Sequence, residues 1–173
     1  MTGGVAIRRV ERAADAPIDG LAELLVDVVD DGASVGFLAP LPQATATAYW
    51  HGVADALGDA LVLWVAEIDG RVAGTVQLAP CTKDNGRHRA DLQKLLVVRA
   101  CRGRGIAAAL LDAAEAFARA GSHTLLVLDT RAGSPAEGVY RRLGWQRVGE
   151  IPDYAADPDG TLMPTAYYYK RLS

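Results

Sequence analysis

A chain of 173 residues has the length of a single globular domain and can bury a full apolar core. Half of the residues are apolar and the mean hydropathy is +0.09, yet no uninterrupted apolar stretch approaches the ~18–20 residues that cross a bilayer, so we expect a soluble protein without membrane association. The net charge of −3 argues against a general binder of nucleic acid.

The first half of the sequence predicts two helices and three strands. Asp15 and Pro17 supply a cap and a first-turn proline for the first helix. Residues 30–43, DDGASVGFLAPLPQ, contain too many Gly, Ala and Pro residues to hold one periodic element. Asp69-Gly70 separates two β-rich runs and is a strong hairpin signal. The expected elements are a strand over 6–10, helices over 18–29 and 45–57, and strands over 61–68 and 71–78.

The second half predicts a strand, a glycine loop, a helix and a closing set of shorter elements. Asn85-Gly86 lies in the polar stretch CTKDNGRHR, which should form an exposed turn. A strand over 90–98 leads into a long helix that stops at Gly121. The remaining elements are strands over 124–130, 145–150 and 165–172 and a short capped helix over 134–144. We therefore expect one mixed α/β domain over residues 1–173.

Cysteine and histidine usage gives no sign of a disulfide framework or a metal site. Cys81 and Cys101 do not form a CxxC pair, so we expect free thiols. The three histidines have no metal-ligand spacing, which argues against a bound metal. The segment MTGGVAIRRVER has no apolar signal-peptide region, which predicts a cytoplasmic location.

The segment Arg102-Gly103-Arg104-Gly105-Ile106-Ala107 joins a strand to a helix. Its glycines let backbone N–H groups turn toward an anion at the helix N-terminus, which is a typical phosphate site. Arginines at 99, 102 and 104 add positive charge that suits a pyrophosphate. An ordinary structural turn between a strand and a helix is the alternative.

Residues 103–108 also match the GxGxxG/A fingerprint of dinucleotide-binding folds, and Asp129 ends the next strand, where a ribose-binding acid would lie. In that fold, however, the glycines directly follow an almost entirely apolar strand. Here RACR intervenes and the strand carries Asp91 and Lys94. Too little chain follows Asp129 for the rest of such a domain. We therefore prefer the interpretation given next, in which the loop binds the pyrophosphate of a different cofactor.

The motif RGRGIA after a strand resembles the pyrophosphate loop [Q/R]-x-x-G-x-[G/A] of the GNAT superfamily of N-acetyltransferases. The sequence VYRRLGW resembles the family's tyrosine followed by a Gly-aromatic pair, and the order of elements agrees over nearly the whole chain. The segments ASVGFLAPL, HRADLQKLLV, LDTRAGSPAEGVYRRLGW, GEIPDYA and YYYKRL are similar to the tabtoxin-resistance acetyltransferase group within that superfamily. Two positions depart from the family pattern: Arg99 stands where proline is common, and Gly133 where asparagine is common.

The resemblance implies an α/β (α+β) fold with a mixed, mostly antiparallel twisted sheet, flanked by helices, whose splayed central strands bind acetyl-CoA as cosubstrate without a metal. It places the pantetheine along the third predicted strand and the pyrophosphate on the glycine loop. An unpaired N–H of the splayed strands would donate a hydrogen bond to the thioester oxygen as negative charge develops there. The implied cofactor-binding residues are Leu95, Leu96, Val97, Arg102, Gly103, Arg104, Gly105, Ile106, Ala107 and Ala108.

Acetyl transfer to an amine needs a base, because alkyl amines are mostly protonated at neutral pH. Asp91 is the leading candidate; it lies four residues before Leu95, ~13 Å along an extended strand, and would act through water. Asp129 ends a buried strand and is the candidate for binding the acceptor amine or for a second base. Each aspartate also has a non-catalytic interpretation: Asp91 as a solvated or salt-bridged carboxylate at a strand edge, and Asp129 as a cap or turn residue. By resemblance, Tyr140 protonates the departing CoA thiolate, and Cys101 is too far from the acetyl end for covalent catalysis.

Three loop-rich segments are expected to meet the acceptor: Asp31–Pro42, Asn85–Arg89 and Ile151–Pro164. Their mixture of acidic, basic and apolar residues suits a small amine-bearing metabolite or toxin. A peptide or protein N-terminus is the enzymatic alternative, and an idle acyl-CoA-binding regulator the non-enzymatic one. We expect a monomer or homodimer.

Overall fold

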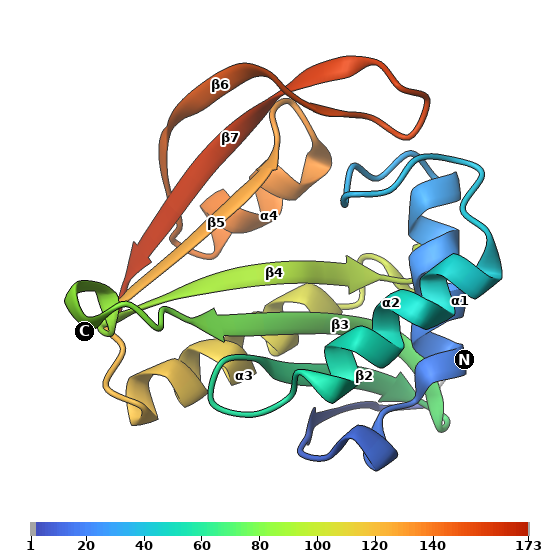
Figure 1. Cartoon of the computed structure of the whole chain (residues 1–173), viewed down its shortest axis with the longest axis horizontal. Helices are drawn as coiled ribbons and strands as arrows, with labels where there is room; N and C mark the ends of the chain where they lie inside the picture. Colours follow the sequence, from blue (N-terminus) through green and yellow to red (C-terminus); the bar gives the residue numbers. More distant parts are fainter. Residues whose placement is uncertain (1–2, 173) are drawn as a thin grey trace.

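The computed structural model describes residues 3–172, in which seven strands form one sheet with four α-helices around it (Figure 1). Met1 and Thr2 of the amino-terminal segment considered above lie outside these residues. The strands are β1 (Val5–Val10), β2 (Val62–Ile68), β3 (Arg71–Pro80), β4 (Arg89–Val97), β5 (Leu125–Arg131), β6 (Gln146–Ala156) and β7 (Leu162–Arg171). The helices are α1 (Ile18–Asp30), α2 (Gln43–Asp55), α3 (Ile106–Ala120) and α4 (Pro135–Arg142).

The strand order is β1-β2-β3-β4-β5-β7-β6, and every neighbouring pair is antiparallel except β4 and β5. The predicted hairpin at Asp69-Gly70 is confirmed: Ile68 pairs with Arg71, and both turn residues have positive φ. The mixed, mostly antiparallel sheet predicted from the sequence is therefore confirmed. No helix among residues 3–172 combines the length and the apolar character needed to cross a membrane.

The central strands β4 and β5 pair over three residues only, from Arg89–Leu125 to Asp91–Val127. Beyond these pairs β4 stays bonded to β3 and β5 stays bonded to β7, so the two strands diverge (Figure 1). We call the separation of the two backbones beyond their last pair the gap; Asp91 lies at its closed end. Splayed central strands are thus confirmed.

Two apolar cores fill the two faces of the sheet. Helix α3 packs on one face with Ile106, Leu110 and Leu111, and α4 contributes Tyr140 to this α3-side core. Helices α1 and α2 cover the other face, where Leu25 and Trp50 are fully buried in the α1–α2-side core (Figure 1). Helices on both faces hold β1 to β4 in place, whereas, among residues 3–172, the α1–α2-side core contains no residue of β5, β6 or β7.

A bulge at Lys94 changes the face to which β4 residues point. Between the pairs Gln77–Gln93 and Thr75–Leu96, β3 advances two residues while β4 advances three. Leu92 and Leu96 would share a face in a regular strand, yet Leu92 belongs to the α3-side core and Leu96 to the α1–α2-side core. The backbone of Lys94 accordingly has φ +48°, a value uncommon for a residue with a side chain.

The last two strands are longer than predicted. The sequence indicated an irregular insertion over 151–164, but β6 continues to Ala156 and β7 begins at Leu162, which leaves a turn at 157–161. Pro152 and the surrounding aspartates are typical of loops, and they mask the strand in the sequence. A proline is tolerated here because β6 is the edge strand of the sheet.

Candidate active site

The glycine loop lies at the open end of the gap, between β4 and α3. Gly103 and Gly105 have φ +78° and +77°, in the left-handed region that favours glycine. The first backbone bond into α3 runs from Ala109 N–H to Gly105, so the N–H groups of the first helical residues have no helical acceptor. A Cβ placed on Gly103 or Gly105 would meet no heavy atom within 4 Å. Donors that face open space at a helix N-terminus fit a pyrophosphate.

A third glycine, which the sequence analysis did not single out, lets α3 approach the sheet at this point. A Cβ on Gly74 of β3 would lie 2.9 Å from the carbonyl oxygen of Leu96 and 3.0 Å from Cγ2 of Ile106. Any larger residue would push the start of α3 away from β4. The backbone amides of the glycine loop therefore keep a fixed position relative to the gap.

Two of the loop arginines are held by carboxylates of α1 and the residue after it. Arg102 Nη1 lies 2.5 Å from Asp31, and Arg99 Nη1 lies 3.2 Å from the same carboxylate. The backbone N–H of Arg99 also donates to Asp27 at 3.0 Å. The Arg102 and Arg99 guanidinium groups keep the pKa of Asp31 below its usual range. The positive charge expected for the pyrophosphate is thus partly balanced by Asp31, while Arg104 donates to the Gly3 carbonyl at 3.1 Å.

The predicted pantetheine-binding residues form the far part of β4, beyond its pairing with β5. Leu95 and Val97 pack against the α3-side core, and Leu96 is buried in the α1–α2-side core. The edge of β4 that faces β5 has no strand partner at these residues. An extended polar ligand could bond to this edge as a strand does.

Tyr140 lies in the α3-side core and is 6% exposed. Its ring packs against Trp145 and Tyr168, with centroid separations of 5.9 and 6.0 Å. Its hydroxyl has no hydrogen-bond partner within residues 3–172, and its oxygen is not completely enclosed. Burial, and then the charge of Asp129, raise the pKa of Tyr140, which keeps it protonated and able to donate.

Glu137 is a buried carboxylate on α4, the helix that carries Tyr140, and the sequence analysis did not identify it. Glu137 accepts hydrogen bonds from the Gly133 N–H at 2.7 Å, from Arg147 at 3.3 Å and from the Tyr168 hydroxyl. Burial raises the pKa of Glu137, but these hydrogen bonds outweigh it and leave the pKa below its ordinary value. The bonds tie α4 to β6 and β7 and hold the neighbours of Tyr140. The only signal in the sequence is that Glu137 and Tyr140 are three residues apart, which places them on the same side of a helix.

The two predicted aspartates lie on the face opposite Tyr140. Ala90 and Leu92 on β4, and Leu128 on β5, belong to the α3-side core. Because side chains alternate along a strand, Asp91 and Asp129 point to the other face of the sheet. Burial raises the pKa of Asp91; Arg89 lowers it and the nearby charge of Asp129 raises it further. Asp129 is exposed and forms no ion pair within the described residues. The two aspartate carboxylates and the Tyr140 phenol therefore lie on opposite faces of the sheet.

Lys94 joins this set, although the sequence analysis gave it no role. Its Nζ lies 5.7 Å from the centroid of the Tyr49 ring of α2. Gln77 donates to the Tyr49 hydroxyl at 3.2 Å, and Phe37 packs edge-on against the same ring. The bulge turns Lys94 to this face, and a bulge of this kind has no reliable sequence signal.

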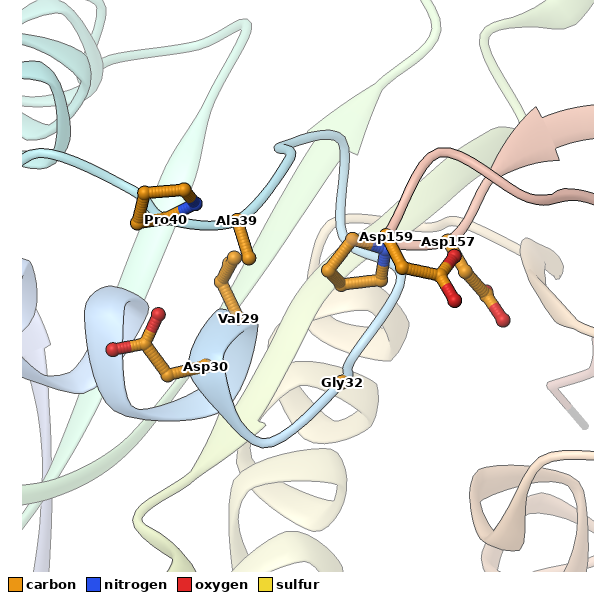
Figure 2. Close-up of a pocket in the computed structure, with 8 residues that line it drawn as sticks. Val29, Asp30, Gly32, Ala39, Pro40, Asp157 and Asp159 are labelled. Atoms are coloured by element: carbon orange, nitrogen blue, oxygen red, sulfur yellow. The ribbon is translucent and has the colours of Figure 1, made fainter.

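The rim above the gap is formed by two of the three predicted acceptor segments. The Ala39 N–H donates to Pro158 at 2.8 Å, and Ser34 donates to Ala156 at 3.2 Å, so the α1–α2 loop meets the β6–β7 turn. A pocket of 540 Å³ lies between them (Figure 2). Arg131 binds the Asp157 carboxylate at 2.7 Å and steadies the turn. The pocket is lined by Val29, Asp30, Gly32, Ala39, Pro40, Asp157, Pro158 and Asp159, and by none of the three predicted catalytic residues.

The third acceptor segment lies elsewhere. Residues 85–89 precede and begin β4 beside the start of β5, and the Thr124 N–H donates to His88 at 2.8 Å. This is the end of β4 opposite the glycine loop, away from the α1–α2 loop (Figure 1). The structure therefore separates Asn85–Arg89 from the other two predicted acceptor segments, because β3 and β4 turn at the closed end of the gap. A contact between Asn85–Arg89 and the acceptor stays a prediction. Among residues 3–172, no group of three His, Cys, Asp or Glu side chains is placed to hold a metal ion.

Comparisons with known proteins agree with this geometry. The model of the acetyltransferase (GNAT) family matches residues 36–145, more than half of the chain. An uncharacterised N-acetyltransferase of Azospirillum brasilense is 30% identical over 129 residues, which cover 73% of this chain and 76% of that protein. N-acetylaspartate synthetase of Danio rerio is 37% identical over 92 residues, 53% of this chain and only 32% of that protein.

A solved structure extends the agreement to the fold. A putative acetyltransferase from Salmonella typhimurium, determined with its cofactor acetyl-CoA, superposes with a TM-score of 0.78 at 18% identity. The match covers 99% of this chain and 95% of that one. With a GNAT fold, a matching family model and similar N-acetyltransferases, this chain belongs to the GNAT family and is an N-acetyltransferase.

Proposed function

We propose that this protein transfers an acetyl group from acetyl-CoA to the primary amine of a small molecule, by direct attack of the amine on the thioester. The observation that carries the proposal is the gap between β4 and β5, which ends on the unpaired amides of the glycine loop and has Asp91 and Tyr140 on opposite faces. When bound, acetyl-CoA supplies an activated acyl group. The residues below bind it and move the protons.

The glycine loop and the free edge of β4 are the binding elements for the cosubstrate. Amides from Gly103 to Ala108 hold the pyrophosphate, and the edge of Leu95–Val97 bonds the extended arm. One amide of this edge stabilises negative charge on the thioester oxygen. The match to a family member solved with acetyl-CoA supports this assignment.

Asp91 acts as the general base. Burial raises its pKa, which makes its carboxylate a stronger base than that of a solvent-exposed aspartate. Because it lies at the closed end of the gap, it accepts the ammonium proton through a water molecule. Asp129, exposed on the same face, binds the ammonium group before deprotonation.

Tyr140 acts as the general acid. Its hydroxyl is protonated throughout the physiological range and is not completely enclosed, so it donates its proton to the departing sulfur. The tight packing of Trp145 and Tyr168 holds the ring and limits the loss of entropy in the reaction.

The acceptor in this proposal is an amino-acid-like metabolite or toxin in the cytoplasm. The contact between the α1–α2 loop and the β6–β7 turn narrows the rim, which favours a small molecule over a peptide. The relative named for N-acetylaspartate, an acetylated amino acid, agrees with this class. The similarity to the tabtoxin-resistance group makes toxin detoxification one role to test, and the protein works as a monomer or homodimer without metal or nucleic acid.

An acetyl-CoA turnover screen with thiol release as readout tests the proposal. The panel contains amino acids, β-lactam-like dipeptide toxins, polyamines, aminoglycosides and peptides. We expect turnover of at least one small amine above the hydrolysis background. Turnover of peptides alone would assign the protein to peptide acetylation, and acetyl-CoA binding without any turnover would assign it to the regulators.

A further inference from the structure

Lys94 is a half-buried cation without an ion-pair partner among the described residues. By contrast, one arginine of the glycine loop and one at the end of β5 are paired with carboxylates: Arg102 with Asp31, and Arg131 with Asp157. Burying an ammonium group without a carboxylate costs free energy, and here the residue also adopts a left-handed backbone conformation. Such a cost is usually offset by a function.

The ammonium group of Lys94 lies at a defined place on the acceptor face. It sits over the Tyr49 ring of α2, and a Cβ on Gly36 would lie 3.8 Å from Nζ, so the α1–α2 loop passes close to it. The charge of Asp129 is felt by both Lys94 and Asp91, which places the three groups within electrostatic reach of one another. A cation and two carboxylates thus face the same side of the gap.

We propose that Lys94 binds a carboxylate of the acceptor, so that the preferred acceptors carry an amine and a carboxylate on one small molecule. This inference rests on the proposed function and names its substrate class. An amphoteric molecule pairs its ammonium group with Asp129 and its carboxylate with Lys94. A simple amine fills only the first of these positions and leaves the Lys94 ammonium group unpaired.

The contact with Tyr49 does not by itself account for Lys94. A cation is attracted to the face of an aromatic ring, but the ring is no conventional hydrogen-bond acceptor for the three N–H donors of the ammonium group. A charge-assisted bond to a carboxylate is stronger and directional. Burial lowers the pKa of Lys94, and the charge of Asp129 offsets this only in part. A carboxylate bound next to the ammonium group would favour its charged form.

Matched acceptor pairs that differ only in the carboxylate test the inference: phenylalanine and phenethylamine, methionine and 3-methylthiopropylamine, lysine and cadaverine. For each pair we define the selectivity ratio as kcat/KM for the amino acid divided by kcat/KM for the amine. The wild-type ratio should exceed one for at least one pair. Lys94→Met should lower that ratio about 10- to 100-fold, through a higher KM for the amino acid. Lys94→Arg should restore part of it.

Two controls separate binding from folding. Lys83→Met removes an exposed lysine of the β3–β4 connection and should leave the ratio unchanged. Calorimetry should show the acetyl-CoA affinity of Lys94→Met within twofold of the wild type. If the wild type acetylates amines but Lys94→Met does not change the ratio, or if the wild type prefers the amines, the role of Lys94 is overturned and the acetyltransferase proposal stands. If the wild type acetylates neither the amino acids nor the simple amines, both the acetyltransferase proposal and the role of Lys94 are overturned.

Discussion

The two ends of the gap between β4 and β5 are built in different ways. The proposed phosphate site is one contiguous segment, Gly103–Ala108, and its chemistry comes from backbone N–H groups and glycine conformation. The proposed acceptor site combines Asp91, Lys94 and Asp129 from two strands with Tyr49 from a helix, and its chemistry comes from side chains. A backbone site suits a group that is the same in every reaction cycle. Side chains on separate elements suit a group that differs between enzymes, because each can change alone.

The largest effect is expected at the proposed phosphate site. Gly105→Val should reduce acetyl-CoA affinity at least ~100-fold, because a side chain would fill the space of the pyrophosphate and valine does not adopt φ +77° without strain. Calorimetry measures the affinity. Gly70→Val, at φ +74° in the β2–β3 turn, controls for backbone strain and should lower stability while leaving affinity intact. Equal affinity in both variants would contradict the loop assignment.

The next effect concerns rate without affinity. Tyr140→Phe should lower kcat by ~10²-fold or more and leave the acetyl-CoA Kd nearly unchanged, since a proton donor to the leaving sulfur acts after binding. Tyr169→Phe is a matched control, because that hydroxyl is exposed and bonds only Gln146. Wild-type turnover in Tyr140→Phe would remove the tyrosine from the mechanism.

Substitutions of Asp91 and Asp129 should affect different kinetic constants. Asp91 must be ionised to accept a proton, so the wild-type rate should fall as the pH drops through its raised pKa. Asp91→Asn should depress kcat most at about pH 7 and recover partly at higher pH, where the amine loses its proton unaided. Asp129→Asn should raise the acceptor KM about tenfold. Rate–pH profiles on one acceptor separate the two, and an exchange of phenotypes would exchange the roles.

The smallest effect returns to the proposed phosphate site. Asp31→Asn frees Arg102 and Arg99 from their shared carboxylate, so acetyl-CoA should bind about two- to fivefold more tightly at low salt. The gain should fade as salt screens the exposed charges. Asp84→Asn removes a comparable exposed partner from Arg87, far from the loop, and should change nothing. Weaker binding in Asp31→Asn would mean that the carboxylate positions the arginines usefully.

The sequence predicted the parts that depend on contiguous residues. Alternating apolar residues, the Asp69-Gly70 turn and the spacing of Gly103 and Gly105 each encode a local conformation, and all were found. Lys94 was missed because its direction depends on a bulge set by pairing with β3. Glu137 was missed because its partners, Arg147 and Tyr168, come from other elements. Long-range contacts of this kind have no local signature.

The three residue pairs between β4 and β5 have one more consequence, which hydrogen exchange can measure. They divide the sheet into two parts, one formed by β1 to β4 and the other by β5, β7 and β6, which within the described chain are joined by strand pairing only at these three pairs. Beyond these pairs, the β4 amides not bonded to β3 have no strand partner and should exchange quickly. A ligand that lies between the two parts takes the place of the missing strand, so deuterium labelling with and without acetyl-CoA should trace, amide by amide, how deeply it inserts.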